Sequence, residues 1–357
     1  MRIFFATSKR RITVVLTAYL ALQKKRLRQV NWFAADAFDR LVPFITGGKM
    51  LRGGLVLFGF GMSGKKSTPD AVRLAAGVEL IHSALVIHDD IMDQDKLRRG
   101  QPTISAQYAR LAKTKKLALT QHTGESLALC AGDLGFFIAT KLLTEVKFSN
   151  RTRGVISLVG DIISEVCVAQ MQDVWWGSAP PRAVAGLGPS VYEILSMYKY
   201  KTGRYTFSLP LIMGATAGGA AAITLRQLEK LGEYLGIMFQ IKDDEIGIFG
   251  NEKITGKPVG SDIKENKKTI WQVLLWKQAG PSERRKLKNI FGSERILKKD
   301  IGYVRRLIKT RGVSSQVTKY MDSYARRARQ LIENMKIAPA YEKILLELID
   351  YNLNREA

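Results

Sequence analysis

Helical periodicity runs through almost the whole chain, and no other feature limits the possible folds as strongly. Apolar residues recur at spacings of three and four over successive segments, and no stretch alternates apolar and polar residues as a half-buried strand does. Glycine and proline clusters separate the segments, as at residues 47–48 and 177–181. No period typical of solenoid repeats recurs. The pattern predicts an all-α fold in which residues 1–357 form a single large domain.

The periodic segments have recognisable starts and stops. Thr68 is a good helix N-cap, and Pro69 follows it at the first helical position. The longest uncharged run, residues 209–225, contains proline and glycines that suit close helix packing inside a globule, and we predict no transmembrane segment. The predicted helices cover residues 11–29, 32–42, 49–61, 70–94, 102–117, 123–144, 151–175, 191–200, 204–219, 224–247, 268–278, 281–291, 294–311, 313–335 and 339–353.

The N-terminal region superficially resembles a signal peptide, because the apolar residues 13–22 follow a basic stretch, residues 9–11. The apolar residues keep helical spacing, more basic residues follow directly, and no small-residue cleavage site is evident. We therefore predict an amphipathic first helix. Cys130 and Cys167 lie in apolar contexts without metal-ligand spacing, so we expect both to be small core residues of a cytoplasmic protein.

The chain is strongly basic, with 56 Lys and Arg against 32 Asp and Glu and a formal net charge of +24. Such a charge suits nucleic acid, an anionic membrane surface or phosphorylated substrates as partners. A nucleic-acid-binding protein is the weakest of these readings, since no binding motif occurs and basic runs such as residues 284–288 look like solvated helix faces. A peripheral contact with an anionic membrane stays open.

Asp89, Asp90 and Asp93 follow the apolar run of the helix predicted at residues 70–94. Asp89 and Asp93 share a helical face, where like charges repel unless a cation lies between them. Carboxylates in this number suit Mg²⁺, and Arg98 and Arg99 just beyond would suit the phosphates that Mg²⁺ usually shares. A solvated acidic helix end is the alternative explanation.

A second apolar helix ends in the same way, with Gln240 before Asp243 and Asp244. Unpaired buried acids are costly, so packing alone does not explain two helices that each carry adjacent aspartates. We expect the two pairs to face each other and to clamp a diphosphate through Mg²⁺. Other cations would assist, although the segments that carry them can also be read as ordinary surface or core structure. They come from a helix start, a helical face, an aromatic segment and a glycine-rich lid: Lys49 and Arg52, His82, Lys201 beside Thr202, and Lys257 and Lys267.

These segments, taken in order, resemble the trans-isoprenyl (polyprenyl) diphosphate synthase family over residues 40–275. GGKMLRG at 47–53 is similar to the family's GGKxxRP, and HSALVIHDDIMDQDKLRRGQPT at 82–103 to its first aspartate-rich motif. KTG at 201–203 resembles its Lys-Thr element, while FQIKDD at 239–244 and GKPVGSDIKENKKT at 256–269 resemble its second aspartate-rich region and lid. The order and length of these motifs make the resemblance specific.

The resemblance implies a helical bundle around a central cavity, usually dimeric, that joins isopentenyl diphosphate head to tail to dimethylallyl, geranyl or farnesyl diphosphate. By position, Asp89, Asp90, Asp93, Asp243 and Asp244 would hold Mg²⁺ on the allylic diphosphate, with Thr202 and Gln240 nearby. Further charge on that group would come from Arg98, Lys201, Lys257 and Lys267, and isopentenyl diphosphate would be held by Lys49, Arg52, His82 and Arg99. The helices at 281–353 would belong to the same domain.

This chain departs from the family pattern at two positions. Gly247 stands where the second motif often has a third Asp, so one metal contact is absent or is supplied by Glu245. Gly53 replaces proline, which removes backbone stiffness but no charge.

Product length is read from the helix below the first motif. The resemblance implies that short-chain members of the family have aromatic rings at the positions of Ala84 and Leu85. In this chain both residues are aliphatic, and Ile81 lies deeper. We expect a tunnel deeper than a farnesyl chain needs and a geranylgeranyl product, with a farnesyl or longer product as the alternative. A class I terpene cyclase or a head-to-head synthase would not need the Lys49–Arg52 and His82 grip, and a silent partner subunit would be expected to lose aspartates from the first motif, where none is lost.

Overall fold

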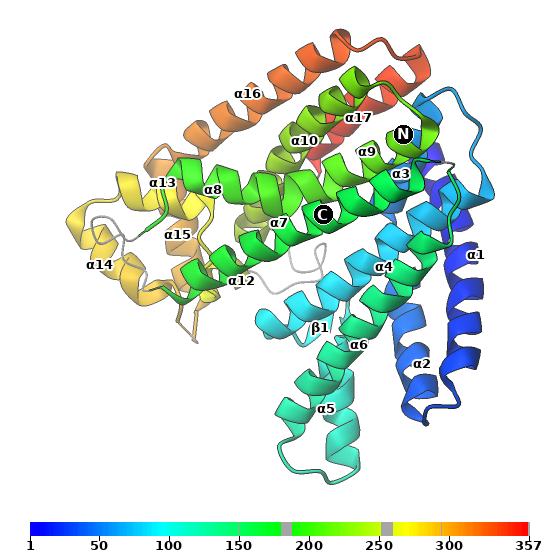
Figure 1. The fold of residues 1–357 in the computed structure, drawn as a ribbon. Coiled ribbons are helices and arrows are strands. Elements are labelled where there is room, and N and C mark those ends of the chain that lie inside the picture. Colours follow the sequence, from blue (N-terminus) through cyan, green and yellow to red (C-terminus); the bar gives the residue numbers. More distant parts are fainter. Residues whose placement is uncertain (149, 180–187, 251–259, 294, 356–357) are drawn as a thin grey trace. The chain divides into compact units, whose positions relative to one another are not determined.

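The computed structural model describes residues 1–148, 150–179, 188–250, 260–293 and 295–355, and these are helical almost throughout (Figure 1). The all-α prediction is therefore confirmed. The chain divides into two compact units, Met1–Val159 with Pro210–Leu225, and Gly160–Leu209 with Arg226–Ala357. They are called unit 1 and unit 2 below, and each has its own core. The prediction from the sequence that residues 1–357 form a single domain stays a prediction.

Unit 1 is built mainly from the first six helices and a short hairpin. Helix α4 lies at its centre, where α1, α3 and α6 pack against it. Thr68 caps α4 by accepting a hydrogen bond from the Ala71 amide at 3.2 Å, with Pro69 as the first helical residue, as predicted. The elements are α1 (Arg2–Leu27), α2 (Phe33–Thr46), α3 (Leu51–Met62), α4 (Pro69–Met92), β1 (Leu97–Arg98), β2 (Gln101–Pro102), α5 (Ile104–Thr114), α6 (Thr120–Thr144) and most of α9 (Leu209–Gly218).

Helices α3 and α9 approach each other so closely that glycine is required on both. A Cβ on Gly214 would overlap the Val56 carbonyl oxygen, and a Cβ on Gly59 would overlap that of Leu211. Side chains at these places would force the helices apart. The prediction that the glycine-rich segment at residues 209–225 packs tightly is therefore confirmed.

Unit 2 contains most of α7 and α10 and the whole C-terminal part of the described chain. Its elements are α7 (Thr152–Ser178), α8 (Val191–Tyr198), the π-helix η1 (Lys199–Ser208), α10 (Ala222–Phe249), α12 (Ser261–Lys264), α13 (Ile270–Gln278), α14 (Pro281–Ile290), α15 (Lys298–Thr310), α16 (Val313–Glu333) and α17 (Pro339–Asn354). The helix boundaries match the periodic segments to within a few residues in most cases, but α1 begins nine residues earlier than predicted, at Arg2 rather than residue 11.

Two local predictions were wrong. Residues 199–208 form one wide π-helical segment, where the sequence indicated the end of one helix and the start of another. Close contact with α10 is one reason, because a Cβ on Gly203 would lie 3.2 Å from the Glu233 backbone. Strands were not expected, yet Leu97–Arg98 and Gln101–Pro102 pair as a two-residue antiparallel ladder. Arg99 and Gly100 make its turn with φ of +53° and +73°, the left-handed pair that such tight hairpins favour.

Both cysteines are exposed, so the prediction that they are core residues was also wrong. Cys130 lies on α6 and Cys167 on α7, each on the outward side of an apolar helix. By length and composition alone, α4, α6 and α7 could each cross a membrane, and α2 with α3, bent by 61°, could form a fourth span. In α4, 78% of the most apolar 18-residue stretch is buried within the protein, against 44% of the corresponding stretch in α6 and 28% in α7.

Candidate functional site

The first aspartate motif lies at the carboxyl end of α4, where the β1–β2 hairpin folds an arginine back onto it. The Arg98 Nε donates to Asp90 Oδ1, and its Nη2 lies 3.3 Å from Asp95 Oδ2 and 3.9 Å from Asp89 Oδ2. Asp90 is only 1% exposed, and burial raises the pKa of its carboxyl to about 7 although Arg98 opposes this. Among the described residues, its Oδ2 has no hydrogen-bond partner. Asp93 ends the helix as its C-cap and is exposed.

A second group of cations in unit 1 gathers around the segment at residues 47–53. The Arg99 guanidinium lies against Gly48, where a Cβ would be 3.4 Å from both of its terminal nitrogens. His82 lies nearby and is half-buried, and its pKa falls well below 6.5 because of desolvation and because Arg52, Arg99 and Arg98 repel its protonated form. Burial and the positive charges of Arg98 and Arg52 lower the pKa of Arg99. Such crowding of arginines around a neutral imidazole is expected of a site made for a multiply charged anion. Lys49 lies on the exposed side of this segment.

The backbone amide of Gly53 makes a hydrogen bond that a proline at this position could not make. Its amide donates to Glu79 Oε1 at 2.7 Å, within the buried contact of α3 and α4. Burial raises the pKa of Glu79, while the Gly53 and Arg52 amides and the nearby arginines oppose the rise. Since proline has no N–H, the departure from the family pattern at Gly53 matches the presence of this buried acceptor.

The residues predicted to set product length lie one to two turns below Asp89 on α4. Ile81 and Ala84 are buried, and Leu85 is partly exposed. Ala84 packs against α6, where a Cβ on Gly135 would be 3.2 Å from the Ala84 Cβ. Leu85 is thus the better placed of the two to line open space. His88 packs on α6 through the Leu129 carbonyl and the Phe136 ring.

The second aspartate motif in unit 2 is held by a chain of hydrogen bonds. Thr202 Oγ1 donates to Gln240 Oε1 at 2.7 Å, and Gln240 Nε2 donates to Asp244 Oδ1 at 2.9 Å. The Tyr198 hydroxyl donates to Asp244 Oδ2 and accepts from the Ile270 amide at 2.9 Å. Asp244 is 1% exposed, and burial raises its pKa. The predicted grouping of Thr202, Gln240 and Asp244 is therefore present, whereas Tyr198 was not predicted.

Lys201 and Lys267 supply positive charge to the same part of unit 2. Lys201 Nζ lies 2.5 Å from Asp173 Oδ2 of α7. Although burial opposes ionisation of Asp173, Lys201 and Lys267 hold its pKa below the usual value. Lys267 also acts on Asp244, where it opposes the effect of burial on the pKa. The predicted Lys257 lies outside the described residues.

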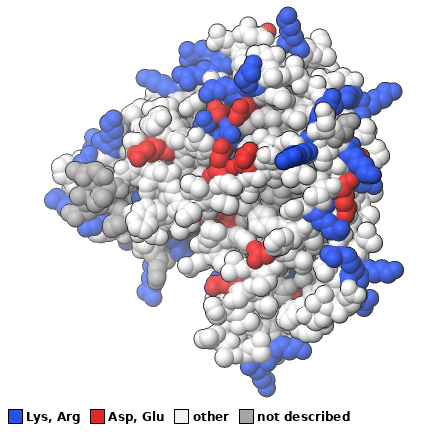
Figure 2. Space-filling view, viewed as in Figure 1, with Lys and Arg blue, Asp and Glu red and all other residues white. Residues whose placement is uncertain are grey.

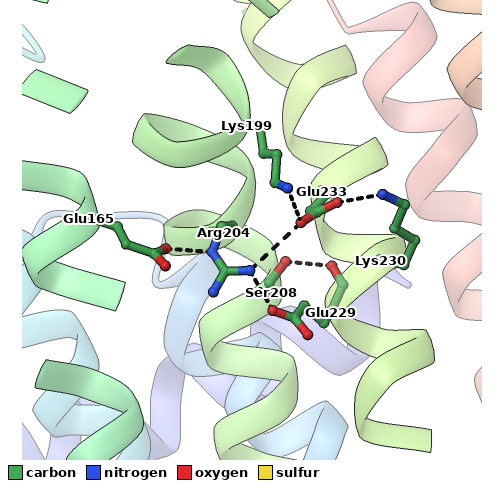
Figure 3. Close-up of polar contacts among 7 residues, drawn as sticks. All are labelled: Glu165, Lys199, Arg204, Ser208, Glu229, Lys230 and Glu233. Atoms are coloured by element: carbon green, nitrogen blue, oxygen red, sulfur yellow. Dashed lines mark hydrogen bonds and ion pairs between the residues drawn. The ribbon is translucent and has the colours of Figure 1, made fainter. Parts of the chain in front are cut away.

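A network of charges centred on Arg204 fixes η1 to α7 and α10 (Figure 3). Arg204 pairs with Glu165 of α7 and with Glu229 of α10, and its Nη1 lies 3.7 Å from Glu233 Oε1. Glu233 also receives Lys199 and Lys230, each at 2.9 Å. From the sequence, Arg204 or Lys199 would be the surface residue of this segment, but the side chain of Arg204 is only 16% exposed and that of Lys199 is 30% exposed. The network therefore holds η1, which carries Lys201 and Thr202, against α7 and α10.

The missing third aspartate of the second motif has its place taken by another carboxylate. A Cβ on Gly247 would lie 2.5 Å from Asp262 Oδ2, so the Asp262 carboxylate occupies the space of a side chain at position 247. Asp262 also acts on Asp244 by raising its pKa, which places the two carboxylates near one another. Glu245, the carboxylate that could otherwise supply this contact, pairs with Lys242 at 3.1 Å.

Asp243 is the exposed member of the second motif and has a C-terminal partner. Arg355 Nη2 donates to Asp243 Oδ1 at 2.8 Å and to the Phe239 carbonyl at 2.9 Å. Its guanidinium lies 3.8 Å from the centroid of the Phe239 ring. Arg355 follows α17, and neither its position nor any spacing in the sequence indicated this contact.

The donor atoms fit magnesium better than a metal held by protein ligands alone. Both motifs offer carboxylate oxygens, the ligands that Mg²⁺ prefers, and Asp90 Oδ2 is a buried oxygen without a partner among the described residues. Within that part of the chain, no three His, Cys, Asp or Glu side chains converge to form a complete metal cage. Mg²⁺ normally keeps waters and shares substrate phosphates, so an incomplete protein shell suits it.

Comparison with known proteins gives the family. The profile of the polyprenyl synthetase family matches residues 36–308. A short chain isoprenyl diphosphate synthase of Methanocaldococcus jannaschii is 31% identical over 256 residues, 72% of this chain and 71% of that protein. A geranylfarnesyl diphosphate synthase of Aeropyrum pernix is 31% identical and a geranylgeranyl diphosphate synthase of Saccharolobus solfataricus 30% identical, each over 87% of this chain and 91% and 88% of their own lengths.

Solved structures agree. The crystal structure of a geranylgeranyl pyrophosphate synthase from Corynebacterium glutamicum, complexed with isoprenyl diphosphate and magnesium, superposes with a TM-score of 0.89. It covers 99% of this chain and 98% of its own, at 25% identity. The predicted family is thus confirmed: this chain is an enzyme of the polyprenyl synthetase family.

Proposed function

We propose that this enzyme joins isopentenyl diphosphate head to tail to an allylic diphosphate and makes geranylgeranyl diphosphate. The observation that carries the proposal is the presence of two separate anion-binding groups. Arg52, His82 and Arg99 form one in unit 1, beside the aspartates of α4. Asp244, Lys201 and Lys267 belong to the other in unit 2. A terpene cyclase needs only one diphosphate site, whereas a condensing enzyme needs two.

The roles follow from charge. Lys49, Arg52, His82 and Arg99 hold isopentenyl diphosphate, and the neutral His82 donates one hydrogen bond without adding charge. Arg98, Lys201, Lys257 and Lys267 neutralise the allylic diphosphate as it leaves, which lowers the barrier to ionisation. The isopentenyl double bond, held close to the resulting cation, attacks it, and apolar walls keep water away.

Magnesium is the cofactor that the carboxylates suit. Asp89, Asp90, Asp93, Asp243 and Asp244 would hold it, and when bound it supplies positive charge to the leaving diphosphate. We assign Asp262 as a sixth carboxylate of this set, because it fills the place of the absent side chain at Gly247. The Lys267 amide donates to the main-chain carbonyl of Asp262 at 2.9 Å, which holds the backbone that carries this carboxylate.

A second copy of the chain is the proposed cover for apolar helix faces. On α6, Leu129 and Phe137 are 43% and 75% exposed, and on α7, Val168, Met171 and Trp175 are 66%, 71% and 76% exposed. Apolar surface of this extent marks an interface. Burial between two copies would account for the low burial of these helices in one chain and fits a cytoplasmic homodimer.

Product analysis tests the function. The enzyme is incubated with Mg²⁺, labelled isopentenyl diphosphate and each allylic primer in turn, and the products are sized by chromatography. The proposal expects a labelled twenty-carbon diphosphate. A labelled fifteen-carbon product alone would overturn the chain length, and an unlabelled hydrocarbon made from the primer alone would overturn the reaction class.

A further inference from the structure

Two turns of unit 1 carry large apolar side chains that are exposed among basic ones. The first, residues 28–33, joins α1 to α2 and exposes 67% of Val30, 59% of Trp32 and 36% of Phe33. The second, residues 113–119, joins α5 to α6 and exposes 51% of Leu117 and 75% of Leu119. Figure 1 shows both turns at the lower end of the molecule. They are called the first and second turns below.

Positive charge predominates around both turns, although Asp36 and Asp39 of α2 follow the first one. Lys24 forms an ion pair with Asp39 at 2.5 Å. The first acid of the chain is Asp36, and no acid occurs between residues 96 and 124. The last turn of α1 carries Lys24, Lys25 and Arg26, and Arg28 follows. All of Lys113, Lys115 and Lys116 are exposed in the second turn. Figure 2 shows basic side chains at the lowest point of this face, where Figure 1 places the second turn.

Side-chain contacts join the two helices that bear these turns, α2 and α5. Arg40 of α2 donates to Gln107 Oε1 of α5 at 3.3 Å, and its guanidinium lies 4.7 Å from the centroid of the buried Tyr108 ring. Asp36 pairs with the same arginine at 2.7 Å. Because these contacts join α2 directly to α5, the helices that bear the first and second turns are held side by side.

The side chains of the first turn are ordered for contact with an interface. The rings of Trp32 and Phe33 stack with centroids 4.0 Å apart, which presents a flat aromatic surface. Single exposed apolar residues are ordinary, but five of them on two neighbouring turns need an explanation. Tryptophan is favoured at the boundary between lipid and water, and nearby lysines and arginines are attracted to anionic headgroups.

We propose that the first and second turns together dock this protein onto an anionic membrane surface. A nucleic acid would use the cations but would leave the aliphatic Val30, Leu117 and Leu119 in water. A bilayer surface accommodates both kinds of side chain, with the apolar tips at the headgroup boundary and the cations among the phosphates. The docking does not depend on the proposed function, although a bilayer is also the phase in which a long prenyl chain dissolves.

Vesicle sedimentation of the full chain tests the docking. We expect the protein to bind vesicles of equal parts phosphatidylcholine and phosphatidylglycerol and not those of phosphatidylcholine alone, with weaker binding at high salt. The triple variant Lys113→Gln, Lys115→Gln, Lys116→Gln should lower the partition coefficient more than about tenfold. The matched control Lys288→Gln, Lys298→Gln, Lys299→Gln removes equal charge from exposed positions of unit 2 and should bind like the wild type.

The apolar contribution is tested separately. The pair Trp32→Ser and Leu119→Ser keeps every charge and should also reduce binding several-fold, most clearly at high salt where the charges are screened. Both altered positions are exposed, so circular dichroism should be unchanged. Equal loss of binding in the unit 2 control would mean that net charge alone drives association, and it would overturn the proposal. Absence of binding to anionic vesicles at low salt would do the same.

Discussion

Replacing Gly53 by proline, the residue that the family pattern has there, should destabilise this protein. The Gly53 amide donates to the buried Glu79 at 2.7 Å, and proline cannot donate. Removing one of the two amide donors to that buried carboxyl costs about 1–3 kcal/mol. A Cβ at this position would also lie 3.0 Å from the Ala75 carbonyl oxygen and 2.7 Å from Ile12 Cδ1, which adds about 1–3 kcal/mol of overpacking. Gly53→Pro should therefore lower the free energy of unfolding by roughly 2–6 kcal/mol.

A matched variant separates the two effects. Gly53→Ala introduces the same Cβ but keeps the amide, so it should show only the overpacking. The free energy of unfolding of the two variants, measured by urea denaturation with fitted midpoints and slopes, should differ by about 1–3 kcal/mol. If proline and alanine destabilise the protein equally, the hydrogen bond to Glu79 contributes nothing and the explanation given for this departure from the family pattern is wrong.

Three further outcomes follow from the structure. Arg204→Ala leaves Glu165, Glu229 and Glu233 without their shared partner and should cost roughly 2–4 kcal/mol in urea unfolding, with Arg204→Lys intermediate because it restores charge but not the fork. Burial lowers the pKa of Lys268 from 10.5 to about 8, so the unfolded chain binds more protons between these values and stability should rise over that pH range. The free energy of unfolding of the wild type, measured relative to that of Lys268→Met, should therefore rise over the same pH interval. A difference between the two proteins that stays constant with pH would contradict the lowered pKa of Lys268. Leu85→Phe should shorten the product, as read by chromatography, and an unchanged product would show that Leu85 does not face the growing chain.

Periodicity was enough to predict the helical fold, and motif order was enough to predict the family, while the roles of the site residues stay predictions. Local patterns work for these because an amphipathic helix and a pair of adjacent aspartates are written in neighbouring positions. Asp262 and Gly247 show what such patterns miss, since a carboxylate from one segment fills the space of a side chain absent from another. Nothing at either position signals that the two meet.

The remaining errors have a similar cause. Arg204 reads as a surface residue because its acidic partners lie on α7 and α10, far away in sequence. No pattern in the sequence indicated the π-helical form of residues 199–208, and within it Gly203 packs tightly against α10, which is distant in sequence. Cys130 and Cys167 sit in apolar sequence, but their helices have apolar residues on both faces, so composition could not say which face is outward.

Steady-state kinetics of Arg99→Gln, with each substrate varied in turn, would show whether the arginines of unit 1 hold isopentenyl diphosphate while the allylic diphosphate is bound separately. We expect a KM for isopentenyl diphosphate raised at least about tenfold, because one charge-assisted contact is lost, with the allylic KM nearly unchanged. A raised allylic KM with an unchanged isopentenyl KM would contradict the assignment of the two sites.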